Sequence, residues 1–327
     1  MGMQLGYTMM TEQAGPKDLV SHVVGAEAVG FDFAVSSDHY FPWLEAQGHA
    51  SYAWSVLGAV TQVTKRVELM TYVTCPTMRY HPAVVAQKAA TMQLLSEGRF
   101  TLGVGSGENL NEHVVGEGWP SVDVRQDMLV EALTIIRQLH SGELTTFDGD
   151  YFRVDSARVW DVPEQGVPIG VAVSGPKSVA KFAPLGDDLI TTEPDAELVT
   201  AWQDTRPAGT PSRVIGQVPI CWDPDRDIAV ATAHEQFRWF AGGWGVNADL
   251  PTTHGFASAT KYVRPEDVAE TIPCGPDVDA IVEAVRPCWE AGFTHVALVQ
   301  VGDAGQDRFL AEAAGPILAA LREAAPS

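Results

Sequence analysis

Short runs of apolar residues alternate with longer amphipathic stretches along the whole chain. Apolar runs bounded by Gly, Pro, Asn or Asp predict buried β-strands, and the stretches between them predict α-helices. This alternation favours a parallel sheet built from βα units over an all-α or all-β fold. The predicted strands are residues 3–9, 31–37, 67–73, 100–106, 168–174, 187–192, 212–222 and 294–300.

Helices are predicted between the strands from their start and stop signals. Pro16 stands in the first turn of one helix and Gly30 follows its end, while Pro82 begins another. The predicted helices are residues 16–29, 82–95, 122–140, 176–184, 226–241, 277–291 and 306–324. Eight strands with intervening helices in 327 residues predict a (β/α)8 TIM barrel with insertions, because the bare fold needs only about 250 residues.

The extra length falls in two predicted insertions, near residues 107–165 and 242–276. The first of them contains the segment FDGDYFRVD, which predicts a β-hairpin. Because no Pro-, Gly- or Ser-rich linker divides the chain, we expect residues 1–327 to form a single domain. A doubly wound open sheet stays as the alternative layout.

Composition narrows the classes of function. The chain has 21 Lys and Arg against 42 Asp and Glu, a net charge of −21, so binding to nucleic acid or to an anionic membrane is not expected. No apolar run approaches the ~18 residues of a membrane span, and the N-terminus lacks the basic start of a signal peptide. The four cysteines lack C-x-x-C spacing and fit reduced thiols. We therefore expect a cytoplasmic protein.

Side chains that follow the strand ends form the active site of a TIM barrel. The second predicted strand runs into Asp38 and His39, and Trp43 follows four residues later. These residues could supply an orienting carboxylate, a base and a wall for a flat ligand. A loop with a capping Asp and a surface His is the alternative interpretation.

The fourth predicted strand ends in glycines at alternate positions, Gly103, Gly105 and Gly107. Without a Cβ atom, such a backbone lets a planar or anionic ligand come close. The spacing differs from the dinucleotide-binding fingerprint, so a Rossmann site is not favoured. The next residue, Glu108, is either a solvated acid at a helix start or a carboxyl group placed for proton transfer.

The fifth predicted strand leads into Ser174, Gly175, Lys177 and Ser178. A strand end of small residues that opens a helix exposes backbone N–H groups, and the lysine adds a positive charge, so the segment is either an anion site or a plain βα turn. The histidines and cysteines form no metal-binding pattern, and no G-x-S-x-G elbow of a hydrolase is present. We expect no metal.

These motifs resemble the luciferase-like monooxygenase superfamily, and within it the coenzyme F420 (deazaflavin) dependent oxidoreductases typified by F420-dependent glucose-6-phosphate dehydrogenase. The resemblance covers nearly the whole chain. It is carried by SSDHYFPW, CPTMRYHPAVVAQKAATM, GVGSGENLNE, DGDYFRVDSARVWDVPEQGVP and SGPKSVAKFA. It implies a (β/α)8 barrel, a homodimer, and the cofactor F420 in a cavity at the C-terminal ends of the strands.

The resemblance also implies roles for individual residues. Asp38 would hydrogen-bond the cofactor ring, His39 would take the proton of the substrate hydroxyl, Trp43 would shape the reacting face, and Glu108 would transfer a proton at the ring. A non-proline cis peptide is implied between Tyr72 and Val73, behind the ring. Further implied cofactor contacts are Thr74, Cys75, Ser106, Gly107, Asn111, Ser174, Gly175 and either Lys177 or Ser178.

The chain departs from the sugar-phosphate enzymes in the substrate region. Where those enzymes place a lysine, this chain has Asp195 in the segment that contains Thr192. A carboxylate repels a phosphate dianion, so a small, non-phosphorylated substrate is expected, with Trp222, Trp239 and Trp244 as candidate walls. The expected reaction is a reversible hydride transfer between the deazaflavin and a carbinol carbon. The alternatives are an F420H2-dependent reductase of an imine, enone or ketone, an FMN-dependent monooxygenase, and a non-catalytic cofactor-binding protein.

Overall fold

The computed structural model describes residues 2–207 and 209–325. Within this part of the chain, eight parallel strands form a closed barrel in the order β1-β10-β9-β8-β7-β4-β3-β2. All the predicted strands are confirmed, and the closure of the sheet excludes the doubly wound alternative. The barrel strands are β1 (Gln4–Met9), β2 (Phe33–Ser36), β3 (Glu68–Thr71), β4 (Phe100–Val104), β7 (Ile169–Ala172), β8 (Asp188–Ile190), β9 (Val214–Ile220) and β10 (His295–Gln300).

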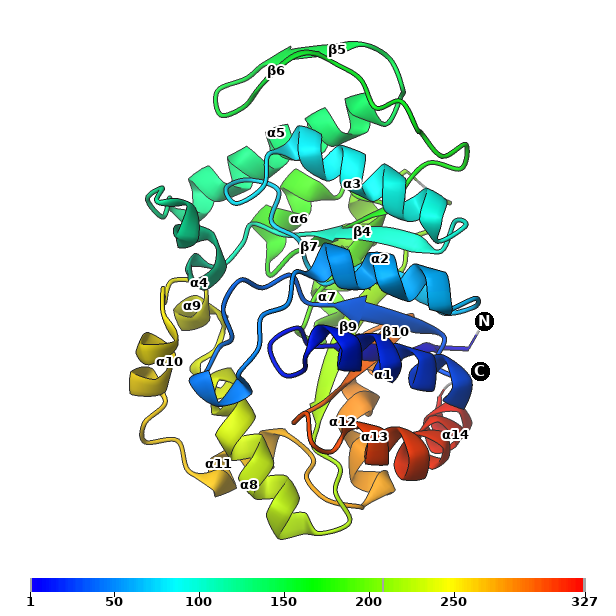
Figure 1. Ribbon diagram of the computed structural model, residues 1–327, viewed down its shortest axis with the longest axis vertical. Helices are drawn as coiled ribbons and strands as arrows, with labels where there is room; N and C mark the ends of the chain where they lie inside the picture. The colour runs from blue at the N-terminus through cyan, green and yellow to red at the C-terminus, as the bar shows by residue number, and fades with distance from the viewer. Residues whose placement is uncertain (1, 208, 326–327) are drawn as a thin grey trace.

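Helices cover the outside of the barrel (Figure 1). The predicted helices at 16–29 and 82–95 match α1 and α3 residue for residue. The predicted helix at 226–241 ends at Phe237 and continues as the 3-10 segment Arg238–Gly242, and the one at 306–324 is interrupted by a π-helical segment, Phe309–Ala313. The covering helices are α1 (Pro16–Val29), α2 (Ala53–Val63), α3 (Pro82–Leu95), α5 (Val122–Leu139), α6 (Pro176–Phe182), α7 (Ala196–Thr205), α8 (Arg226–Phe237), α12 (Val278–Glu290), α13 (Gln306–Arg308) and α14 (Ala314–Ala324).

Apolar side chains alternate between the inside of the barrel and the layer beneath the helices, as the pleat of a strand requires. Along β2, Phe33 and Val35 belong to an interior cluster, whereas Ala34 packs in the outer core. Gly6 leaves the space that the Phe33 ring occupies, because a Cβ atom there would lie 2.4 Å from its Cζ atom. The rest of the interior cluster consists of Met70, Ile190, Ile215 and Ala297.

The elements within the two predicted insertions lie at different places on the barrel. The predicted hairpin is confirmed as β5 (Thr145–Asp148) and β6 (Arg153–Ala157), which lie at one extreme of the molecule beyond α5 (Figure 1). The other segments, α4 (Asn109–Glu112), α9 (Trp244–Asn247) and α10 (Thr253–Ala259), gather opposite the two chain termini (Figure 1). The Asn109 N–H donates to the Ala248 carbonyl at 2.9 Å. This side is the C-terminal end of the barrel. The remaining helix, α11 (Pro265–Thr271), lies next to α8. None of the helices described is both long and apolar enough to span a membrane.

Candidate functional site

His39 lies in the loop after β2, at the C-terminal end of the barrel, with 8% of its surface exposed. Its Nδ1 atom lies 3.1 Å from the Phe41 carbonyl oxygen and 3.3 Å from Oε1 of Glu12. Because both neighbours are acceptors, we infer that Nδ1 carries a hydrogen and that the neutral ring presents the Nε2 lone pair. This tautomer is the one that a general base needs.

Glu12, which follows β1 in the chain, is the carboxylate behind this imidazole, and the sequence analysis missed it. Its side chain is 1% exposed. Its Oε2 atom accepts hydrogen bonds from the hydroxyls of Thr11, at 3.2 Å, and Ser37. The remaining oxygen is therefore free to face His39, so that a buried carboxylate orients the ring and can stabilise an imidazolium. The signal for Glu12 was its place three residues after a barrel strand.

Asp38 points away from His39 and into the protein, with no exposed side-chain surface. Its Oδ2 atom accepts from Trp54 Nε1 at 3.1 Å and Thr74 Oγ1 at 2.7 Å. Its Oδ1 atom accepts from Tyr80 Oη at 3.1 Å and Arg79 Nη2 at 3.2 Å. The carboxylate therefore ties the His39 loop to α2 and to the segment after β3. The implied contact of Asp38 with a cofactor ring stays a prediction.

The segment after β3 forms the wall next to Asp38. The implied non-proline cis peptide between Tyr72 and Val73 is present. The Tyr72 hydroxyl is buried and has no hydrogen-bond partner among the residues described. Cys75 is buried beside Thr77, and burial raises the pKa of its thiol well above the ordinary value, which disfavours the thiolate form.

The glycine corner after β4 brings Glu108 against the His39 loop. At Gly107, φ is +82° and a Cβ atom would lie 2.6 Å from the Cys75 sulfur, so this position requires glycine. Beyond it, the Asn111 Oδ1 atom accepts from the backbone N–H groups of Tyr40, at 2.8 Å, and Phe41, at 3.2 Å. Its Nδ2 atom donates to Glu108 Oε2 at 3.4 Å. Asn111 thus contacts the loop of the predicted base directly, and Glu108 is linked to that loop through Asn111. Ser106 lies half-buried at the same corner.

Aromatic rings close the site on the other side of His39. The Trp43 ring lies 4.9 Å from the imidazole, between centroids, and Trp239 stacks on Trp43 at 4.1 Å with an interplanar angle of 7°. The Phe256 ring meets Trp43 edge-on at 5.1 Å. The Trp239 Nε1 atom is buried without a partner in the described part of the chain, so this N–H remains available to an acceptor.

The other predicted substrate residues are not part of this aromatic group. Trp222 is buried at the end of β9, where its backbone N–H donates to Gln300 Oε1 at 3.0 Å. Trp244 is 50% exposed on α9, and Thr192 is exposed. Asp195 is the N-cap of α7, and one carboxylate oxygen accepts from the N–H groups of Glu197 and Leu198 at 2.8 and 3.2 Å.

The predicted anion segment begins α6. The Ser178 hydroxyl accepts from the backbone N–H groups of Ser174 and Gly175, both at 3.2 Å, and donates to the Gly175 carbonyl at 2.8 Å. Ser178 therefore shapes the turn, whereas Ser174 and Lys177 are exposed. A Cβ atom at Gly175 would meet nothing within 4 Å, so there is open space beside this turn. No group of three or more potential metal ligands exists among the residues described.

Comparisons with known proteins agree with this geometry. The family model described as luciferase-like monooxygenase matches residues 3–295. An F420-dependent glucose-6-phosphate dehydrogenase of Amycolatopsis mediterranei is 37% identical, over 98% of this chain and 99% of that protein, and one of Kribbella flavida is 36% identical, over 99% of each. The structure of an F420-dependent secondary alcohol dehydrogenase with an F420-acetone adduct is similar, with a TM-score of 0.85 and 30% identity, over 95% of this chain and 98% of that one. The chain belongs to the luciferase-like monooxygenase family.

Proposed function

We propose that the protein is a coenzyme F420-dependent oxidoreductase that transfers a hydride between the deazaflavin and the carbinol or carbonyl carbon of a small substrate. The observation that carries this proposal is His39, whose Nδ1 faces two acceptors and whose ring lies beside Trp43 at the C-terminal end of the barrel. The F420-dependent relatives, which match over nearly the whole chain, support the choice of cofactor and reaction class.

The residues around the site fit a flat cofactor with an anionic tail. Open space lies beside Gly175, where a Cβ atom would meet nothing within 4 Å, whereas the space beside Gly107 is taken by Cys75 and Glu112. Ser106, Gly107 and Asn111 would hold the ring, with the segment from Tyr72 to Cys75 behind it. Ser174, Gly175 and Lys177 would hold the phosphate, with Ser178 shaping their turn.

When bound, the deazaflavin supplies a carbon that accepts or returns a hydride. An alcohol releases a hydride readily only if its hydroxyl proton leaves as the transition state forms, and Nε2 of His39 is the base for that proton. Glu12 stabilises the imidazolium that results. The Trp43 and Trp239 rings exclude water from the reacting face. Glu108 holds or moves a proton at the edge of the ring. In the reductive direction the same protons move the opposite way.

The test of cofactor identity is a direct binding measurement on the purified protein. We expect F420 to bind with a Kd of about 1 μM or tighter and FMN to bind at least about 100-fold more weakly. The deazaflavin's intrinsic fluorescence and the flavin's own fluorescence give the two titrations separately. Tighter binding of FMN would favour a flavin monooxygenase, and binding of F420 without turnover of any alcohol, ketone, enone or imine would favour a carrier.

We propose that the substrate is small and carries no phosphate. Asp195 caps α7, and it also stands where the similar sugar-phosphate enzymes place a lysine, so its carboxylate would repel a phosphate dianion instead of attracting it. We expect kcat/KM for uncharged secondary alcohols or ketones to exceed that for glucose 6-phosphate by about 100-fold or more. The Asp195→Asn variant, which keeps the α7 cap but removes the charge, is the matched control for Asp195→Lys. Of the two, the lysine variant should gain more activity on the phosphate ester. A wild-type preference for glucose 6-phosphate would contradict this proposal.

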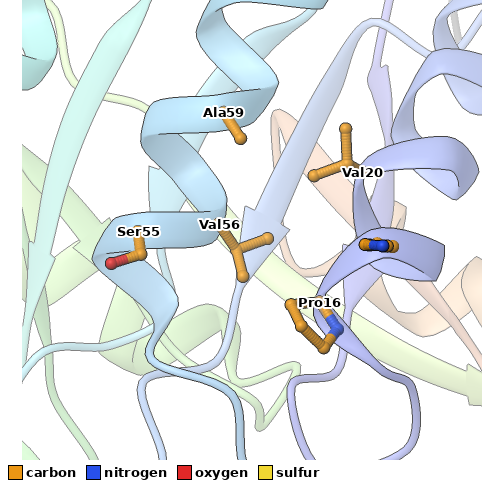
Figure 2. Close-up of a pocket in the computed structure, with 6 residues that line it drawn as sticks. Pro16, Val20, Ser55, Val56 and Ala59 are labelled. Carbon is orange, nitrogen blue, oxygen red and sulfur yellow. The ribbon is translucent and has the colours of Figure 1, made fainter.

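We also propose that the protein is a homodimer, as the resemblance implies, and that α1, α2 and α3 form the interface. An apolar groove runs between α1 and α2, with Pro16 and Val20 facing Val56 and Ala59 (Figure 2). The three helices also carry exposed apolar side chains: Val24, Val63, Val84, Leu94 and Leu95. Such a surface favours a partner of the same kind. Sedimentation equilibrium of the purified protein should give a mass twice that of one chain, and the Val63→Asp variant should have the mass of a single chain.

The cytoplasm is the location that we propose for this enzyme. All four cysteines are free thiols, which fits a reducing compartment. Fractionation of the native host is the test, and recovery of the protein outside the cytoplasmic fraction would contradict this assignment.

A further inference from the structure

We infer that Arg79 is a positioning residue that holds the loop of His39 and helix α4 of Glu108 in one arrangement. This inference rests on the proposed function, because it concerns the two groups assigned to proton transfer. Arg79 lies in the segment between β3 and α3, and its side chain is 8% exposed. It therefore sits between the two other strand-end segments, as the barrel order β4-β3-β2 requires.

On one side, Arg79 binds the residue immediately before His39 in two ways. Its Nη2 atom donates to the Asp38 carbonyl oxygen at 2.6 Å and to the Asp38 carboxylate at 3.2 Å. The first bond fixes the peptide that leads into His39. The guanidinium also lies 4.6 Å from the centre of the Tyr80 ring, whose hydroxyl donates to the same carboxylate. A lysine at this position could replace the charge but not the planar set of donors.

On the other side, Arg79 binds the last residue of α4. Its backbone N–H donates to Glu112 Oε2 at 2.9 Å, and its Nε atom lies 3.5 Å from Oε1. The Glu112 side chain is 1% exposed, so this ion pair is shielded from solvent. Without the guanidinium, the buried Glu112 carboxyl group loses the polar side chain that it faces, and we expect the two segments to shift in response.

The geometry explains why one arginine can serve two groups of the site. Glu108 and Glu112 are the N-cap and the last residue of the same one-turn helix, so fixing Glu112 also fixes the direction of Glu108. Asn111 makes a second, independent link to the His39 loop through Tyr40 and Phe41. Loss of Arg79 should therefore leave the loop tethered but displaced. A displacement of about 1 Å in a catalytic group lowers turnover about 100-fold.

The test compares Arg79→Met and Arg79→Lys with Arg213→Met. Arg213 is a matched control, because it is an ion-paired arginine of the barrel, 2.6 Å from Asp188, at the opposite ends of the strands. The first measurement needs no cofactor: mass spectrometry follows the rate at which diethylpyrocarbonate modifies His39. We expect about a fivefold faster modification in Arg79→Met, through local opening of the loop, and no change in Arg213→Met.

The second measurement separates kcat from KM with cofactor and substrate. We expect kcat of Arg79→Met to fall about 30- to 100-fold with KM changed less than about threefold, and Arg79→Lys to recover part of that loss. Unchanged His39 protection and unchanged kcat in Arg79→Met would overturn the positioning role. If the wild type itself showed no turnover, only the proposed function would fail, because the His39 modification rates would still decide the role of Arg79. Should Arg79→Met not fold, Arg79→Lys must show the same changes in weaker form, and its failure to do so would overturn the inference.

Discussion

Replacing His39 with Asn is expected to lower kcat by about 100- to 10,000-fold while the Kd of the cofactor changes less than about threefold. Asparagine keeps a polar side chain of similar reach, but it has no group that takes a proton near neutral pH. The Nδ1 side of His39 is already committed to Phe41 and Glu12, so the lost function is that of Nε2 alone. Steady-state kinetics in both directions and a fluorescence titration of the cofactor give the two numbers.

Two further variants sharpen this result. Glu12→Gln should lower kcat about 10- to 100-fold, less than His39→Asn, because it removes the charge that stabilises the imidazolium but leaves the base in place. His49→Asn, at an exposed histidine, should leave kcat unchanged. Turnover of His39→Asn at the wild-type rate would refute the base assignment. If Glu12→Gln kept the wild-type kcat while His39→Asn lost it, His39 would remain the base, but the Glu12 carboxylate would have no electrostatic role in catalysis.

The pairing of Glu12 with His39 shows which part of the site the sequence could predict. His39, Trp43 and Glu108 follow strands whose apolar runs are clear, so the barrel rule predicted them at the same end of the barrel, whereas Asn111 was implied by the family resemblance. Glu12 obeys the same rule after the first strand, but its contact with His39 depends on the neighbouring positions of β1 and β2. Arg79 and Glu112 are joined in the same way, across β3 and β4. The spacing of residues along the chain does not show which side chains of neighbouring strand-end segments touch each other.

Two helices that cover the barrel, α2 and α7, were not predicted from the sequence, and each omission has a physical reason. The α2 segment, AWSVLGAVTQV, has apolar residues at helical spacing, but it contains no charged residue and its N-cap Tyr52 makes no side-chain capping bond, so no start signal marks it. For α7 the start signal was present, since Asp195 caps the helix, but the sequence analysis interpreted this aspartate only as a substrate residue. A capping carboxylate is a sufficient structural reason for an Asp at that position.

Two titratable groups at opposite ends of the barrel, the buried Glu112 and the half-buried His295, are expected to give the folded state opposite dependences on pH. Burial raises the pKa of Glu112 from 4.5 to about 7, partly opposed by Arg79 and reinforced by Glu108 and Asp38. The folded state therefore binds a proton that the unfolded state releases, and this contribution to stability is lost as the pH rises from about 4.5 through 7. Glu112→Gln should gain up to about 3 kcal/mol of unfolding free energy relative to the wild type over that range.

His295, at the start of β10, has the opposite sign. Burial lowers its pKa from 6.5 to about 4, with Arg213 acting in the same direction and Asp32 against it. As the pH falls from about 6.5 to 4, the unfolded state takes up a proton that the folded state refuses, so stability is lost on acidification. His295→Phe should therefore gain up to about 3 kcal/mol relative to the wild type toward pH 4.

Urea unfolding of the cofactor-free protein, followed by tryptophan fluorescence from pH 4.5 to 7.5, measures both trends. Because the two sites lie far apart, the double variant should show the sum of the two single effects within about 0.5 kcal/mol. Parallel pH profiles for wild type and Glu112→Gln would mean that Glu112 stays ionised beside Arg79, and a flat difference for His295→Phe would mean that the ring is protonated in the folded protein.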